Sequence, residues 1–231
     1  MKTKYKHILF DLDHTLWDFE TNARETLVEL YHYYKIEQFH RGTSNDFVMA
    51  YEKINYALWL EYEQKRITKD DLRTERFILA FQEIGIDKQY LPENIWEDYL
   101  EMCPKKSNLI EGAMKICEYL SPKYNLHLIT NGFEKTQNIK VEYSKLDQFF
   151  KTLTTSECVG EAKPHPDIYV EALRKANAVP EDCLMIGDNL INDVFGAIDN
   201  GIDAIWYNPG SLKSDKPVKE IKKLMELEQL L

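Results

Sequence analysis

Five short apolar runs, separated by stretches of helical spacing, constrain the fold of this chain more than any other feature. The runs are mostly continuous rather than alternating, which is typical of strands buried on both faces of a parallel sheet. They lie at residues 7–10, 124–130, 149–155, 183–187 and 203–207. Helices are expected between them at residues 112–120, 134–146, 166–176 and 193–200. The sequence therefore predicts an α/β fold with a Rossmann-like doubly wound parallel sheet.

The segment between the first and second runs breaks this alternation. Residues 20–105 hold no strand-like run bounded by turns, and helical spacing dominates there. We expect helices at residues 21–34, 44–64, 68–84 and 92–102. The domain prediction is a catalytic core of residues 1–19 and 106–231 with an inserted all-helical cap of residues 20–105. Residues 219–231 are expected to close the core as an amphipathic helix.

Composition and charge exclude several classes of protein. The formal net charge of −10 over 231 residues argues against a surface that binds nucleic acid, because such surfaces are basic. An anionic substrate therefore needs a local attraction, from a divalent cation or a lysine. No apolar stretch could span a membrane, and the basic residues 1–7 precede too short an apolar run for a signal peptide. We expect a cytoplasmic protein whose four cysteines are reduced and mostly buried.

Asp11 and Asp13 follow directly on the first apolar run, within the segment DLDHT at residues 11–15. Residues two apart in an extended chain share one face, so their carboxylates would crowd together. This arrangement suggests a metal site, an acid/base pair, or both. The alternative is an Asp-rich turn that caps the following helix.

Polar motifs also follow later strand-like runs. Thr130, Asn131 and Gly132 could cradle phosphate oxygens with a hydroxyl, an amide and a backbone N–H, although TNG is also a common turn. Lys163 precedes a proline, where its charge could neutralise an oxyanion. His165 stands between two prolines, and we assign it no role.

Asp188 and Asp193 follow Gly187, at the end of the fourth run. Because the carboxyl ends of parallel strands meet at one edge of a sheet, we expect these two carboxylates to converge with Asp11, Asp13 and Lys163. Four carboxylates around one lysine require a hard cation, and Mg²⁺ is the natural choice for oxygen ligands.

In chain order, these motifs resemble the four motifs of haloacid dehalogenase superfamily phosphatases, and the resemblance covers essentially the whole chain. Residues 11–15 resemble the first motif and residues 187–193 the fourth, with Thr130 and Lys163 at the second and third. Residues 58–62 with 67–68, 129–133 and 226–231 are similar to one subgroup, the YjjG-type pyrimidine 5'-nucleotidases. That subgroup hydrolyses UMP, dUMP and dTMP. The resemblance implies a Mg²⁺-dependent phosphatase whose substrate is a small phosphorylated metabolite such as a nucleoside monophosphate. We expect neither a nucleic-acid polymer nor a membrane as a partner.

The resemblance also implies a role for each site residue. Asp11 would attack phosphorus and form an aspartyl-phosphate, while Asp13 would protonate the leaving oxygen and then activate water. Mg²⁺ would be held by the side chains of Asp11 and Asp188 and by the backbone carbonyl of Asp13. Asp193 would orient Lys163 or a water on the metal. Phosphate would be bound by Thr130, Asn131, Gly132 and Lys163.

Other activities share these motifs. A phosphatase of sugar phosphates or other small monoesters remains open, as does a phosphomutase, which differs in how the cap excludes water. A 2-haloacid dehalogenase has no use for Mg²⁺ or for an acid such as Asp13, and a non-catalytic binding protein ranks last. The cap is rich in Tyr, Trp and Phe, which could stack on a nucleobase, but at helical spacing we expect them to pack a bundle. No feature of the sequence indicates an oligomeric state.

Overall fold

A six-stranded sheet, parallel at every strand pair, forms the centre of the computed structural model, which describes residues 4–231. Residues 1–3 of the expected core and of the basic N-terminal segment lie outside the described residues. The strands are β1 (His7–Phe10), β2 (Asn125–Thr130), β3 (Phe150–Thr155), β4 (Cys183–Gly187), β5 (Asp203–Tyr207) and β6 (Glu220–Ile221). The five predicted strands and the parallel, Rossmann-like fold class are confirmed.

The strand order brings the ends of β1, β2 and β4 to one edge. The order is β3-β2-β1-β4-β5-β6, so β1 lies between the strands that carry the later motifs. Phe10, the last residue of β1, is in register with Leu128 of β2 and Ile186 of β4. The strand order reverses between β1 and β4, and open α/β sheets bind ligands at such a point.

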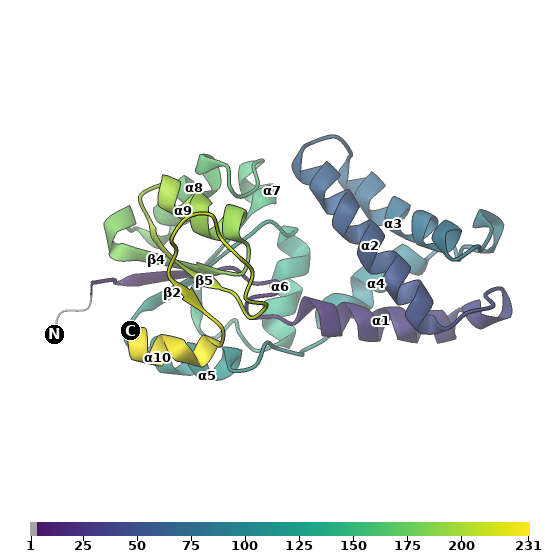
Figure 1. Cartoon of the computed structure of the whole chain (residues 1–231), viewed down its shortest axis with the longest axis horizontal. Helices are drawn as coiled ribbons and strands as arrows, with labels where there is room; N and C mark the ends of the chain where they lie inside the picture. Colours follow the sequence, from purple (N-terminus) through teal and green to yellow (C-terminus); the bar gives the residue numbers. More distant parts are fainter. Residues whose placement is uncertain (1–3) are drawn as a thin grey trace. The chain divides into compact units, whose positions relative to one another are not determined.

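Helices cover both faces of the sheet. In Figure 1, α8 (Pro166–Ala176) and α9 (Gly196–Asp199) lie on one side, and α5 (Ala113–Leu120) and α10 (Leu227–Leu230) on the other. Helices α6 (Glu134–Tyr143) and α7 (Ser156–Val159) follow β2 and β3 in the sequence. Leu9, Ile129 and Met185 pack with Ile168 and Tyr169 of α8, all fully buried. Burial on both faces explains why the strands read as continuous apolar runs.

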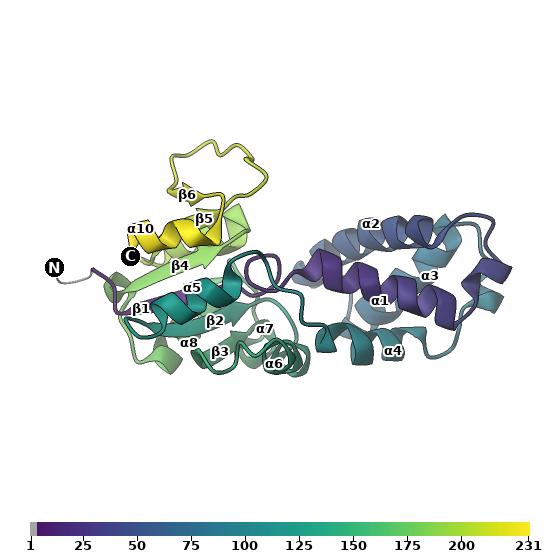
Figure 2. The same cartoon turned by 90° about the horizontal axis from the view of Figure 1, so that it is seen from below.

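The prediction of one amphipathic helix over residues 219–231 is wrong. Residues Glu220–Ile221 form β6 beside β5 (Figure 2), and only a 3₁₀ turn (Leu224–Glu226) and the short α10 follow. Residues 219–221 pair with the edge of the sheet, because the amides of Trp206 and Asn208 donate to the carbonyls of Lys219 and Ile221, each at 2.8 Å. Pairing with β5 therefore overrides local helical spacing.

Two other predicted helices have different bounds. The helix expected at residues 193–200 begins earlier as a π-helical segment (Leu190–Phe195) before α9, because the Asn189 side chain caps it by accepting from two backbone amides at 3.0 and 2.9 Å. Helix α6 ends at Tyr143 rather than at residue 146. Past its end, the Ser144 hydroxyl donates to the carbonyl of Lys140, and Lys145 has a positive φ of 61°.

The chain divides into two compact units, which we call the core unit (Met1–Phe19 with Lys106–Leu231) and the helical unit (Glu20–Lys105). The helices of the second are α1 (Phe19–Tyr33), α2 (Ser44–Glu63), α3 (Lys69–Glu83) and α4 (Ile95–Met102), with 3₁₀ turns at Ile36–Gln38, Lys88–Tyr90 and Cys103–Lys105. A capping box begins α3, where Thr68 and Asp71 exchange backbone-to-side-chain hydrogen bonds at 2.9 and 3.1 Å. The aromatic rings of Tyr31, Tyr51 and Phe77 are buried in this unit, as expected for side chains that pack a bundle.

None of the four cysteines, all of which lie within residues 4–231, forms a disulfide. Cys103, Cys117 and Cys183 are buried, and Cys158 is exposed. Within residues 4–231, none of the helices combines the length and the apolarity that crossing a bilayer demands.

His127 is a buried imidazole in β2 whose pKa couples stability to pH. Its Nε2 lies 3.1 Å from Nδ1 of His7, and its Nδ1 lies 2.8 Å from Oγ1 of Thr152. Burial lowers the pKa of His127 from 6.5 to about 4, and the charges of His7 and Lys151 act in the same direction. Between these values the unfolded chain binds more protons than the folded one, so the stabilising contribution is complete above pH 6.5 and is lost as the pH falls toward 4.

We expect His127→Asn to make stability less dependent on pH. Urea unfolding of the wild type should give a free energy of unfolding that declines between about pH 7 and about pH 5, and the decline should be shallower in the variant. His32→Asn, which changes an exposed imidazole, serves as the control and should keep the wild-type slope. An unchanged slope in His127→Asn would contradict the assignment.

Candidate active site

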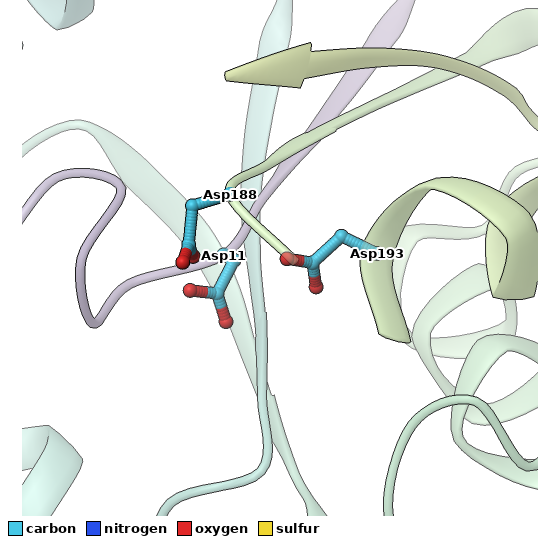
Figure 3. Close-up of side chains that lie close together, drawn as sticks. All are labelled: Asp11, Asp188 and Asp193. Carbon is cyan, nitrogen blue, oxygen red and sulfur yellow. The ribbon is translucent and has the colours of Figure 1, made fainter. Parts of the chain in front are cut away.

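Three carboxylates meet at the carboxyl ends of β1 and β4. One oxygen from each of Asp11, Asp188 and Asp193 lies within 4.8 Å of the other two. Figure 3 shows the three side chains turned toward one another. Asp11 and Asp193 are only 7% and 1% exposed, so water screens their charges poorly.

Lys163 is the cation of this cluster. Its Nζ donates to Oδ1 of Asp11 and to Oδ1 of Asp193, each at 2.6 Å, and to the carbonyl of Ile129 at 2.9 Å. All three ammonium protons therefore have acceptors, which a buried lysine requires. Asn131 fixes the backbone of this lysine, accepting from its N–H at 2.7 Å and donating to its carbonyl at 3.1 Å. The loop after β2 thus positions the loop that carries Lys163.

The charges of the cluster are only partly balanced. Burial raises the pKa of Asp11 well above its usual range despite the opposing charge of Lys163, and Asp193 and Asp188 raise it further. Burial and the charge of Asp193 raise the pKa of Asp188 to about 7. For Lys163, burial lowers the pKa, but Asp11 and Asp193 outweigh it and the pKa is raised. Buried carboxylate oxygens with uncompensated negative charge fit a hard divalent cation.

Small and hydroxylated residues make the close approach possible. A Cβ on Gly187 would lie 2.3 Å from Cγ of Asp193, so only glycine leaves room for that carboxylate. The Thr15 hydroxyl donates to Oδ1 of Asp188 at 3.1 Å and accepts from its backbone N–H at 3.0 Å. The indole N–H of Trp206 donates to the carbonyl of Asp188 at 2.7 Å. Asp188 is therefore held in place by the loop after β1 and by β5.

The carboxylate of Asp13 is bound elsewhere, by helix α6. Lys140 Nζ lies 2.5 Å from its Oδ1, and Gln137 Nε2 donates to its Oδ2 at 3.0 Å. Both α6 side chains are buried. Sequence reasoning missed Gln137 and Lys140, and the available signal was two polar residues three apart on the face that α6 turns inward.

The predicted phosphate-binding residues lie at the end of β2. Thr130 is buried, and its hydroxyl accepts from the backbone N–H of Gly132 at 3.1 Å. Asn131 uses its amide to hold Lys163, as described above, and the phosphate-binding roles stay predictions. His165, to which we assigned no role, begins α8 as its N-cap, with Nδ1 accepting from the amide of Asp167 at 3.3 Å.

Buried carboxylates and a lysine, placed where the strand order of a parallel α/β sheet reverses, are typical of an enzyme active site. Comparison with known proteins specifies this class. Residues 5–201 match the family of haloacid dehalogenase-like hydrolases, and the chain belongs to that family. Within the family it is a phosphoric monoester hydrolase, as the motifs predicted.

Relatives resemble the chain over nearly its full length. Pyrimidine 5'-nucleotidase YjjG of Escherichia coli is 30% identical over 99% of this chain and 98% of its own. Pyrimidine 5'-nucleotidase PynA of Streptococcus pneumoniae is 31% identical over 98% of this chain and 94% of its own. The crystal structure of the hydrolase YfnB from Bacillus subtilis, solved bound to magnesium, superposes with a TM-score of 0.85 at 30% identity and covers 99% of each chain.

The raised pKa of Asp188 predicts a stability cost in the metal-free protein. Since the folded-state pKa of about 7 exceeds the usual 3.8, the folded state holds this proton longer, and stability falls as the pH rises between these values. Asp188→Asn should therefore stabilise the EDTA-treated protein at about pH 8 by about 1–2 kcal/mol, with little effect near pH 4. Thermal unfolding at both pH values checks this. Equal effects at the two pH values would contradict it.

Proposed function

We propose that this protein is a Mg²⁺-dependent 5'-nucleotidase that releases phosphate from pyrimidine nucleoside monophosphates in the cytoplasm. The observation that carries the phosphoryl-transfer chemistry is the separate placement of two neighbouring carboxylates. Asp11 lies in the buried cluster with Lys163, whereas Asp13 is bound by Lys140 and Gln137. Two carboxylates in different environments can take different roles in one reaction.

Asp11 is assigned the nucleophile. Lys163 holds its Oδ1, which fixes the direction of the carboxylate and leaves Oδ2 for in-line attack on phosphorus. Attack forms an aspartyl-phosphate and releases the leaving alcohol, and water then cleaves the acyl phosphate and restores Asp11. The Lys163 ammonium, together with Thr130, Asn131 and Gly132, would bind the charge that spreads over the equatorial phosphate oxygens.

Asp13 is assigned the acid and base. It would give a proton to the leaving ester oxygen in the first step and take one from the attacking water in the second, as microscopic reversibility requires. Its side chain is 21% exposed, which leaves it accessible to a leaving group while α6 holds its two oxygens. A phosphomutase would transfer the phosphoryl group to an acceptor other than water. A dehalogenase would need no acid at residue 13.

A magnesium ion would be held by the carboxylates of Asp11 and Asp188 and by the backbone carbonyl of Asp13. Asp193 would act through its ion pair with Lys163. When bound, the ion neutralises the carboxylates and withdraws charge from the phosphate. The acidic cluster and the magnesium bound to the related YfnB support this assignment.

Replacement of the nucleophile tests the reaction type. We expect Asp11→Asn to lower phosphate release from p-nitrophenyl phosphate in Mg²⁺ by at least about 10³-fold, because the amide cannot form the acyl phosphate. The variant should keep the wild-type circular dichroism. EDTA should abolish the wild-type activity. Undiminished turnover in Asp11→Asn would overturn the nucleophile assignment, and turnover without a metal would overturn the magnesium assignment.

The substrate assignment rests on the relatives YjjG and PynA, whose names describe pyrimidine 5'-nucleotidases. The core unit supplies all the chemistry proposed above. We therefore assign the helical unit the role of the cap, which selects the leaving group. A phosphatase of sugar phosphates would use the same core residues, so the leaving group decides between the two.

A substrate screen separates these alternatives. We expect kcat/KM for UMP, dUMP and dTMP to exceed that for AMP, GMP and glucose 6-phosphate by at least about 10-fold, because a site that pairs with polar groups of the base penalises substrates that lack them. Phosphate release in Mg²⁺ measures this. Equal values for nucleotides and sugar phosphates would overturn the nucleotidase assignment and leave the phosphatase intact.

A further inference from the structure

Lys140 is a buried lysine that the reaction described above does not use. It is 4% exposed and lies in the last turn of α6, where carbonyls favour a cation. Its Nζ lies 2.5 Å from Oδ1 of Asp13, and the neighbouring Gln137 binds the other oxygen of that carboxylate at 3.0 Å. Lysines are rarely buried, so this position indicates a specific task.

Two aromatic rings also lie close to this ammonium. Nζ of Lys140 lies 4.3 Å from the ring centroid of Trp17 and 5.4 Å from that of Phe19. Trp17 is fully buried, and its indole N–H donates to the carbonyl of Lys106 at 3.1 Å. An ammonium between a carboxylate and an aromatic face is desolvated and has little freedom to move. The rings of Trp17 and Phe19 therefore help to fix the position of the ammonium that binds Asp13.

Gly132 completes this arrangement. A Cβ at this position would lie 1.8 Å from Nε2 and 2.6 Å from Cδ of Gln137. The side chain of Gln137 can reach Asp13 only because residue 132 carries no side chain. The loop after β2 and two turns of α6 thus converge on the carboxylate of Asp13.

We propose that Lys140, assisted by Gln137, is a positioning residue that fixes the direction of the Asp13 carboxylate for proton transfer. This inference rests on the proposed function, in which Asp13 serves the leaving group and the attacking water. Each oxygen has one partner on α6, so rotation of the carboxylate is blocked in both directions. A partly exposed Asp without these partners would occupy several rotamers, and displacement of about 1 Å costs rate heavily.

The test is Lys140→Met, which keeps the length and the apolar stem of the side chain. In rapid mixing with p-nitrophenyl phosphate, whose leaving group needs no proton, the first step should keep the wild-type rate. A burst of about one nitrophenolate per enzyme should precede a steady state that is roughly 10- to 100-fold slower, because activation of water by Asp13 is impaired. With UMP the first step itself should slow by a similar factor, with KM within about 3-fold of wild type.

Lys135→Met is the matched control, since Lys135 lies on the same helix and is exposed. It should behave as wild type, and the double variant Lys140→Met/Asp13→Asn should be no slower than Asp13→Asn. Equal loss of burst rate and steady-state rate, unchanged turnover, or an added loss in the double variant each overturns the positioning role.

A crystal structure of Lys140→Met tests the same role without turnover. Asp13 should occupy more than one rotamer, and a single unchanged rotamer overturns the proposal. If the wild type hydrolyses no phosphate ester, the proposed function fails, and this structural readout still decides the role of Lys140.

Discussion

The buried ion pairs of Lys163 are the interaction on which the site depends. One ammonium binds Asp11 after β1, the carbonyl of Ile129 in β2 and Asp193 after β4, so it ties together the ends of three neighbouring strands. Removing one partner from a buried ion pair costs about 3–5 kcal/mol, because an uncompensated charge remains. Without Lys163, the buried Asp11 and Asp193 and the half-buried Asp188 could not share this edge of the sheet in their ionised forms.

Even with Lys163, the cluster keeps negative charge that the protein does not neutralise. Burial raises the pKa of Asp11 and of Asp188, and the neighbouring carboxylates raise both further. Stability alone would favour fewer carboxylates, and their retention is typical of functional sites that trade stability for activity. Two glycines make room for this site, because a Cβ at Gly187 or Gly132 would collide with the side chain of Asp193 or Gln137, respectively.

Much of the fold and part of the site could be predicted from the sequence. Strands buried on both faces give continuous apolar runs, and residues that follow such runs in a parallel sheet must meet at one edge, which locates Asp11, Lys163 and Asp188. Strand β6 could not be predicted, because pairing with β5 overrides its local pattern. Lys140 could not be predicted either, because a lysine on a helix reads as solvent-exposed until the helix is packed against the strand end that it serves.

The course of the backbone explains how one motif yields two environments. Extended geometry would place Asp11 and Asp13 on the same face, but β1 ends at Phe10 and the amides of residues 16 and 17 return to the carbonyl of Leu12. His14 takes a positive φ of 66° in this turn. The turn directs Asp13 to α6 while Asp11 stays in the cluster, so the repulsion expected from their spacing is relieved by the backbone. The crowding that remains comes from Asp188 and Asp193, the carboxylates that follow β4 beside Asp11, and Lys163 offsets it at Asp11 and Asp193.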